Sequence, residues 1–126
     1  TGAANAQGNV IDARATAMKT LGGSLRRVGQ AASVEDARGP AAAIAGAAAR
    51  LETLFPEGSG GPATRSKPEI WQNMADFKAK LAALKDAARA LDAAAKGADL
   101  DAVKTAARNV GGTCGACHRV YRAPRS

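Results

Sequence analysis

Apolar side chains recur at alternating steps of four and three residues between residues 70 and 95. The positions are Ile70, Met74, Phe77, Leu81, Leu84, Ala88, Leu91 and Ala95. This spacing places them on one face of an α-helix, where they form a seam that can pack against other helices. Ser66 and Glu69 fit a capping box, and Pro68 suits the first helical turn. We therefore predict a helix of roughly 27 residues from near Ser66 to a stop at Gly97.

Three other segments show the same heptad-like spacing. The first, over about residues 9–30, has a seam of Ile11, Arg14, Met18, Leu21, Leu25 and Val28. The second, over about 34–54, follows an N-cap candidate, Ser33, and should be kinked or broken by Pro40, with a start near Pro40 as the other possibility. The last begins after Asp99 and ends at Pro124, with a seam of Leu100, Val103, Ala107, Val110, Cys114, Cys117 and Tyr121.

These segments predict an all-α fold, an antiparallel four-helix bundle that forms one domain over residues 1–126. Abundant alanine and only 3% aromatic residues agree with a helical fold. A loop rich in Gly and Pro, residues 56–65, makes the longest connection. Gly22 and Gly23 disfavour the first helix, so we expect another backbone or a flat ligand to come close to them.

Both cysteines and the only histidine lie together near the C-terminus, as Cys114-Gly115-Ala116-Cys117-His118. The spacing C-x-x-C-H suits attachment of a c-type haem, because both thiols lie on one helical face and can add to the porphyrin vinyl groups. The imidazole one turn beyond Cys114 can then reach the iron. A zinc site usually needs four protein ligands, and a thioredoxin-like dithiol needs a βαβ pattern, which is missing. We expect one covalently attached haem c per chain.

The formal net charge of +7 suits acidic partners or anionic surfaces, or a basic face that is only solvated. The Lys and Arg residues are scattered along the predicted helices with no basic block, which argues against nucleic-acid binding. No apolar run approaches the ~20 residues that span a bilayer. Covalent haem attachment takes place outside the bacterial cytoplasm, so we expect a periplasmic protein whose signal peptide has been removed.

On these residues the chain resembles the class II cytochromes c, the cytochrome c prime family. The resemblance is carried by the haem motif near the C-terminus, by the segments RATAM (14–18), PEIW (68–71) and GGT (111–113), and by Tyr121-Arg122. It implies a periplasmic four-helix bundle, often a homodimer paired through its first two helices. It also implies a five-coordinate, high-spin haem that binds nitric oxide and carbon monoxide.

The resemblance also assigns roles to single residues. Cys114 and Cys117 match the thioether attachment points, and His118 matches the axial iron ligand. Arg122 matches a basic residue near that histidine, although an exposed arginine in a frayed last turn is the alternative. Arg14 matches an arginine near the haem propionates, and a cation on an apolar seam independently needs an anion unless it is solvated. Arg65 and Lys67 are weaker candidates for the propionates.

Met18 leaves two functions open. Its position caps the open face of the haem in the family, where a methionine can bind iron through sulfur or pack as an apolar lid. A lid favours a gas-binding protein, and a sixth ligand favours a low-spin electron carrier with an acidic periplasmic redox partner. Met74 is expected in the core. We expect no enzyme, because a second histidine is missing and the carboxylates of Asp76, Asp86, Asp92, Asp99 and Asp101 suit solvated positions.

Overall fold

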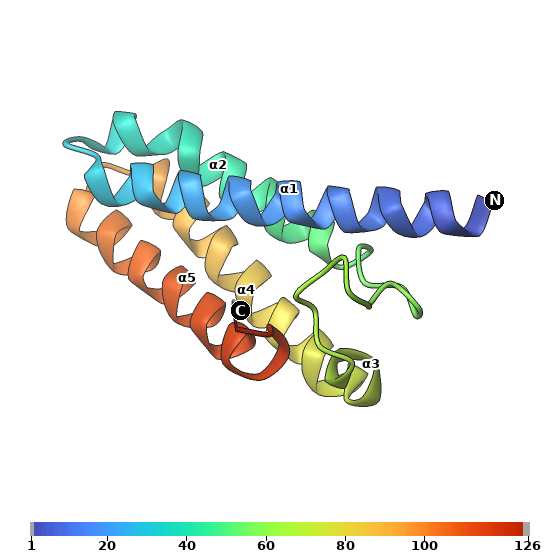
Figure 1. Cartoon of the computed structure of the whole chain (residues 1–126). Coiled ribbons are helices and arrows are strands. Elements are labelled where there is room, and N and C mark those ends of the chain that lie inside the picture. The colour runs from blue at the N-terminus through green and yellow to red at the C-terminus, as the bar shows by residue number, and fades with distance from the viewer. Residues whose placement is uncertain (1, 125–126) are drawn as a thin grey trace.

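The computed structural model describes residues 2–124, with side chains from residue 9 onward. Within that part the chain forms five helices: α1 (Gly2–Gln30), α2 (Val34–Leu51), α3 (Glu69–Gln72), α4 (Met74–Ala95) and α5 (Leu100–Tyr121). The four long helices make an antiparallel bundle, as Figure 1 shows. The predicted all-α four-helix architecture is confirmed.

The core is made by the predicted seams. On α4 every seam residue from Phe77 onward is buried, and Met74 is half-buried. The buried seam of α2 is largely alanine, which allows its close contact with α1. Ala17 and Ser24 on α1 are also buried, so the inner face of this helix is wider than the seam that the sequence predicted.

The helix predicted from Ser66 onward is broken at Asn73, whose backbone angles, φ −127° and ψ 48°, lie outside the helical region. The predicted capping box is wrong: Pro68 occupies the N-cap of α3 and makes no side-chain cap bond. Ser66 instead forms an isolated antiparallel bridge with Arg122. On this broken path Ile70 is buried, while Trp71 Nε1 donates to two carbonyl oxygens of the connection before α3. Such tertiary contacts leave no trace in helical periodicity.

Several other helix ends differ from the predictions. α2 begins at Val34, with Ser33 as its side-chain N-cap, and runs through Pro40 without a break. Pro40 deprives the Asp36 carbonyl of its helical partner, but Asp36 is exposed, so water can bond there. α2 ends at Leu51 rather than at residue 54, and α1 already begins at Gly2. α5 starts after the Asp99 cap as predicted, but it ends at Tyr121, before Pro124.

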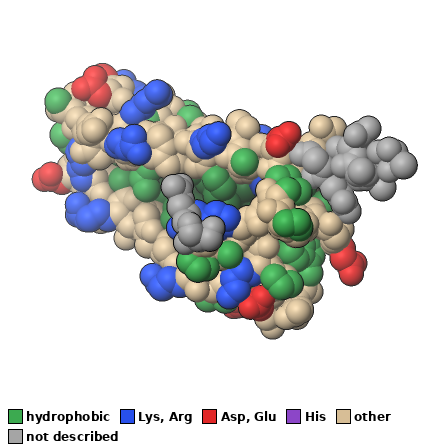
Figure 2. All heavy atoms as spheres, in the orientation of Figure 1, with side chains coloured by type: hydrophobic (Ala, Val, Ile, Leu, Met, Phe, Trp, Pro, Cys, Tyr) green, Lys and Arg blue, Asp and Glu red, His purple; other side chains and the backbone are tan. Residues whose placement is uncertain are grey.

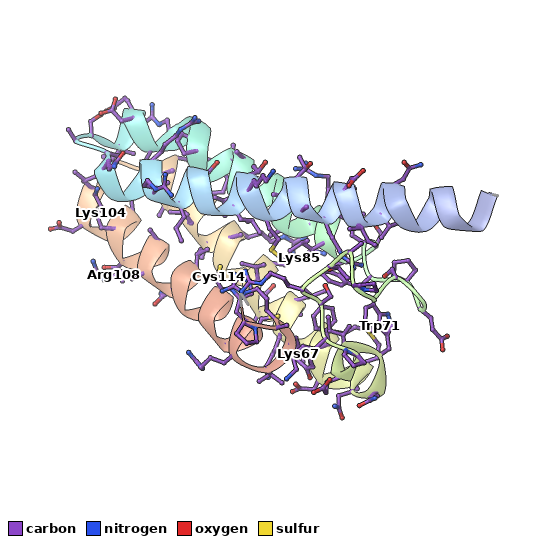
Figure 3. All side chains as sticks on the ribbon, in the orientation of Figure 1. Lys67, Trp71, Lys85, Lys104, Arg108 and Cys114 are labelled. Carbon is purple, nitrogen blue, oxygen red and sulfur yellow. The ribbon has the colours of Figure 1, made fainter. Side chains whose placement is uncertain are left out.

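The arrangement of α1 and α5 positions the site. Lys104 of α5 donates to the carbonyls of Val28 and Gly29, at 2.9 and 2.7 Å, and so holds α5 against the C-terminal end of α1. From there the two helices diverge, as Figures 1 and 3 show. The connection of residues 52–68 runs beside the open end of the bundle. Residues of α1, α4, α5 and this connection line a cavity in this part of the bundle.

Candidate haem site

A cavity of about 600 Å³ lies between the diverging parts of α1 and α5. Hydrophobic side chains are visible in the hollow between these helices in Figure 2. The apolar lining comes from α1, the C-terminal end of α2 with the connection, α3 and α4: Ile11, Ala15, Met18, Leu21, Leu25, Leu51, Phe55, Ala63, Ile70, Phe77, Leu81 and Leu84. The cavity is therefore suited to a large apolar group.

Helix α5 brings the predicted attachment residues to this cavity. Cys114, Cys117 and His118 all line it, and both cysteines are free and half-buried. Burial raises the pKa of both thiols, so they are held in the protonated form. Burial, followed by the positive charges of Arg122 and Arg65, lowers the pKa of His118. The imidazole is thus kept neutral, which is the form that binds a metal.

Of the two adjacent glycines of α1, Gly22 is the one that lies in the cavity wall. A Cβ atom built at Gly22 would meet no atom within 4 Å, and Gly22 lines the cavity. The expectation that a flat ligand lies close to this glycine agrees with that space. Gly23 is not part of the lining, although a Cβ there would also meet nothing within 4 Å.

The charged groups that line the cavity are all positive. Arg14, Lys19, Arg65, Lys80 and Arg122 contribute to its wall, and no carboxylate does among the residues that the structure describes. A haem carries two propionates, and the apolar walls and cationic edge match the two halves of that group. The residues present therefore fit a haem.

Arg14 reaches the cavity wall but finds its partners in the connection. Its guanidinium is buried and donates to the Leu54 carbonyl (3.1 Å), to both oxygens of Ser59 and to Thr64 Oγ1 (3.2 Å). It also lies 4.9 Å from the centre of the Phe55 ring. Neutral oxygens of the connection thus accept hydrogen bonds from Arg14, and its place near a haem propionate stays a prediction.

The remaining predicted residues separate into two groups. Met18 lies one turn beyond Arg14, half-buried in the cavity wall. Arg122 directly follows α5, has an extended backbone and lines the cavity. Arg65 also lines the cavity, and its Nε donates to the Ala123 carbonyl at 2.9 Å. Lys67 does not line the cavity and pairs with Glu69 at 3.2 Å.

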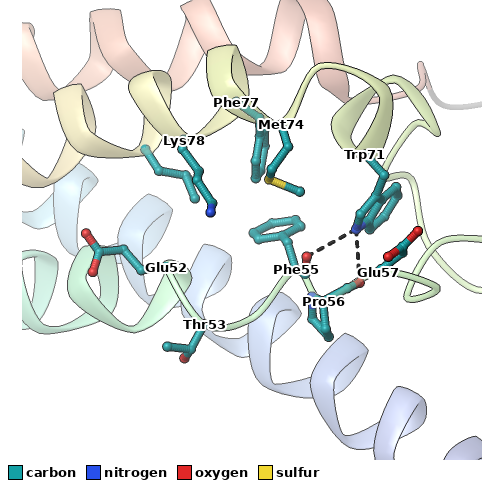
Figure 4. A pocket seen from close by; sticks show the side chains of 10 residues that line it. Glu52, Thr53, Phe55, Pro56, Glu57, Trp71, Met74, Phe77 and Lys78 are labelled. Atoms are coloured by element: carbon teal, nitrogen blue, oxygen red, sulfur yellow. Dashed lines mark hydrogen bonds between the residues drawn. The ribbon is translucent and has the colours of Figure 1, made fainter.

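Met74 lies outside the haem cavity, in a second pocket of about 440 Å³ shown in Figure 4. Phe55, Phe77 and Leu81 line both pockets and form the wall between them. The second pocket contains neither the cysteines nor the histidine, and Glu52, Glu57 and Lys78 contribute to its edge. The cysteines and the histidine of the C-x-x-C-H motif therefore line the larger cavity and not this second pocket.

Sequence reasoning missed Lys80, Tyr121 and Phe55 as parts of the cavity wall. Lys80 lies three residues after Phe77, so the helical spacing that identified the α4 seam also contained the signal for Lys80. Tyr121 was placed on the α5 seam without a partner for its hydroxyl. Phe55 continues the predicted seam of the second helix four residues after Leu51, but α2 ends at Leu51, so Phe55 reaches the cavity from the connection instead.

The model of the family described as "Cytochrome C'" matches residues 9–122 of the chain. The chain belongs to the cytochrome c′ family. This family binds covalently attached haem c, in agreement with the two cysteines and the cavity described above.

Single relatives support the assignment to cytochrome c′. Cytochrome c′ of Pararhodospirillum photometricum is 34% identical over 118 residues, which cover 89% of this chain and 94% of that protein. Cytochrome c′ of Alcaligenes xylosoxydans xylosoxydans is 43% identical over 77 residues, covering 57% of this chain. That match spans 61% of the relative, which is less than two thirds of its length.

Solved cytochrome c′ structures show the same bundle. A nitric oxide complex of a cytochrome c prime variant from Alcaligenes xylosoxidans is 29% identical, with a TM-score of 0.84 and coverage of 94% of this chain and 97% of that chain. A cytochrome c′ described as having an unusual ligand-controlled dimer dissociation is 28% identical, with a TM-score of 0.86 and the same coverage of both chains. In this chain, no helix among the described residues is long and apolar enough to cross a membrane.

Proposed function

We propose that Cys114 and Cys117 hold the haem through thioether bonds and that His118 is the axial ligand of its iron. The support is the convergence of all three side chains on one cavity of matching size and polarity. Since burial keeps both cysteines as thiols, each retains the proton that addition to a vinyl group consumes. The neutral His118 ring supplies a nitrogen lone pair.

We further propose that the protein binds diatomic gases, nitric oxide and carbon monoxide, with Met18 as an apolar lid. A haem held by His118 on one side would supply a five-coordinate, high-spin iron with one position open to a gas ligand. The observation that carries this proposal is the apolar α1 face at Met18, Leu21 and Leu25, which all line the cavity. Such side chains give bound dioxygen no hydrogen bond and leave little room for larger ligands.

A second candidate function is electron transfer by a low-spin, six-coordinate haem with Met18 as the sixth ligand. The position of Met18 in the cavity wall favours this candidate as well. The cations of the wall, among them Lys19, Lys80 and Arg122, would then attract an acidic redox partner to the haem edge. Electron exchange is compatible with the gas-binding function, but a bonded Met18 would oppose gas binding.

The absorption spectrum of the reduced protein, before and after carbon monoxide, separates the two functions. A broad high-spin spectrum that sharpens with the gas means an open iron position and supports the lid. A sharp low-spin spectrum that does not change on addition of carbon monoxide means that the Met18 sulfur is bonded to the iron. That result overturns the gas-binding proposal. Met18→Leu is the matched variant, because it keeps an apolar side chain of similar size without sulfur. If the parent protein has a high-spin spectrum, Met18→Leu should leave it unchanged. If the parent has a low-spin spectrum, Met18→Leu should convert it to a high-spin one.

The site suits binding rather than catalysis. His118 is the only histidine and is assigned to the iron, so no second imidazole remains for acid–base work. Asp76, Asp86, Asp99 and Asp101 are exposed on helices or caps, and none of them lines the cavity. We place this binding function in the periplasm, where covalent haem attachment occurs.

We also propose a homodimer paired through α1 and α2. Small exposed side chains on these helices, such as Ala13, Ala42 and Ala49, allow a second copy to approach closely. Ala42→Trp and Ala49→Trp should each yield monomers in sedimentation experiments. Ala83→Trp on the exposed face of α4 is the control and should leave the dimer intact. An unchanged sedimentation coefficient in both α2 variants would remove the dimer proposal.

A further inference from the structure

We propose that the outer face of α5 is a docking surface for a protein that presents carboxylates and donates one electron to the ferric haem. The surface consists of Lys104, Arg108, Gly112, Gly115 and Arg119, which we call the α5 stripe. This inference deepens the proposed function, because it rests on the assignment of haem to the cavity beside α5. It holds whether or not the Met18 sulfur is bonded to the iron.

The helical repeat aligns cations that are separated in the sequence. The five positions of the α5 stripe follow one another at steps of four, four, three and four residues, which places them on one face of the helix. Figure 3 shows Lys104, Arg108 and Cys114 in this order along α5. The chain contains no Asp or Glu from residue 102 to residue 124, so no acidic side chain interrupts this face.

The cations of the α5 stripe are not neutralised by carboxylates of the same chain. Arg108 Nη2 donates to Thr105 Oγ1 of its own helix at 3.1 Å, and Lys104 donates to carbonyl oxygens at the end of α1. The ion pairs among the described residues belong instead to α2, α3, α4 and the residues flanking them: Arg38–Glu35, Lys67–Glu69, Lys80–Asp76, Lys85–Glu52 and Lys96–Asp92. The stripe therefore keeps its positive charge available to a partner.

Helix α1 extends this positive face across the mouth of the cavity. Lys19 lines the cavity, and Arg26 is exposed one turn beyond Gly22, which also lines it. Asp12 is the only acidic residue from residue 9 to residue 30. In Figure 2, Lys and Arg side chains flank the hollow between α1 and α5. Positive charge on both sides of the cavity steers an acidic partner towards the haem.

The side chains of the α5 stripe favour a protein partner over a membrane or a nucleic acid. The stripe has no large apolar side chain to enter a lipid surface and no aromatic ring on which bases could stack. Val120, an exposed large apolar residue, follows Arg119 by one position and so lies off the stripe. What remains is two guanidinium groups, which pair well with carboxylates, and glycines that let a partner approach the helix beside Cys114.

Stopped-flow reduction of the ferric haem protein tests the docking surface, with the hydroquinone of flavodoxin as an acidic one-electron donor. Arg108→Gln/Arg119→Gln removes two exposed charges from the α5 stripe. The matched control, Lys78→Gln/Arg89→Gln, removes two exposed charges from α4. At low ionic strength we expect the α5 variant to react at least about tenfold more slowly than the parent, and the α4 control within about twofold of it. High salt should bring the three rates together.

Three results would overturn the docking surface. The first is an equal rate with flavodoxin in the α5 variant and the α4 control. The second is an equal slowing of the α5 variant with the neutral semiquinone of lumiflavin, because that donor has no charge to dock. The third is a loss of binding to phosphatidylglycerol vesicles in the α5 variant without any loss of rate, which assigns the stripe to a membrane.

Carbon monoxide binding by the ferrous parent, measured on the same preparation, keeps the two proposals apart. Failure to bind the gas overturns the gas-binding proposal and leaves the comparison of reduction rates intact. Gas binding together with equal rates in both double variants overturns the docking surface alone.

Discussion

The Tyr121 hydroxyl donates a hydrogen bond of 2.5 Å to Asp76 Oδ2, which joins the last residue of α5 to the first turn of α4. Lys80 pairs with the same carboxylate at 3.1 Å. The Tyr121 ring also packs edge-on against Phe77, with ring centres 5.1 Å apart. Because Tyr121 comes three residues after His118, this contact fixes the end of the helix that carries the proposed iron ligand.

The Tyr121–Asp76 contact should make stability depend on pH at both extremes. The hydrogen bond from Tyr121, followed by that from Lys80, lowers the pKa of Asp76. The contribution of ionised Asp76 to the stability of the fold is therefore present above the usual carboxyl pKa and is lost as the pH falls. Asp76 raises the pKa of Tyr121 to about 12, so that contribution is present below the usual tyrosine pKa and is lost as pH rises through 12. Tyr121→Phe should lower the thermal midpoint most between about pH 5 and pH 9.

Circular dichroism melting of the parent and Tyr121→Phe across this pH range checks the prediction. A difference in midpoint that stays constant from acid to alkaline pH would contradict it. A second measurement uses the fact that Tyr121 is the only tyrosine. In Asp76→Asn, the pKa of Tyr121 measured by ultraviolet titration should fall from about 12 towards the ordinary tyrosine value of about 10.

Gly22 should tolerate a methyl group but not a large side chain. Gly22→Ala removes a poor helix former and is expected to stabilise the haem-free chain by up to about 1 kcal/mol, since a Cβ meets nothing within 4 Å. Gly22→Leu should fill part of the haem cavity and reduce the yield of haem-loaded protein. Gly23→Leu is the matched control, because Gly23 lies outside the cavity wall. Equal haem content in the two leucine variants, measured by pyridine haemochrome absorption, would count against this placement.

Trp71 should stabilise the connection by hydrogen bonding as well as by its ring. Its Nε1 donates to the carbonyls of Phe55 (3.1 Å) and Pro56 (2.9 Å), as the dashed lines in Figure 4 show. Trp71→Phe keeps an aromatic ring but leaves these carbonyls without that donor, so we expect a loss of about 1 kcal/mol. Urea unfolding followed by circular dichroism measures this value. A denaturation midpoint equal to that of the parent would show that water replaces the indole.

Lys80 should raise the haem reduction potential, because a positive charge at the cavity wall disfavours the oxidised iron. Lys80→Met removes that charge and leaves the Asp76 carboxylate without its ion pair, so both effects lower the potential. We expect a fall on the order of tens of millivolts. Lys78→Met is the control on the same helix, since Lys78 lies at the second pocket. Similar potentials for both variants in spectroelectrochemical titration would refute a specific role for Lys80.

The sequence alone predicted the bundle and the residues that we propose to hold the haem. Apolar steps of three and four residues are local consequences of the helical repeat, so the α4 seam from Phe77 to Ala95 was predictable. The spacing of Cys114, Cys117 and His118 is likewise a local property of one helix. Their convergence on one cavity follows once that helix packs against its neighbours.

Only the tertiary structure decided the partner of Arg14, the break at Asn73 and the partner of the Tyr121 hydroxyl. Each depends on contacts between segments far apart in the chain: Arg14 bonds Ser59, 45 residues away, and Tyr121 bonds Asp76 across the same separation. The Arg14 contact lies in the irregular connection, where backbone oxygens become acceptors only through the path of the chain. Helical periodicity predicts which side of a helix faces inward. It does not predict which atom of another segment lies opposite that side.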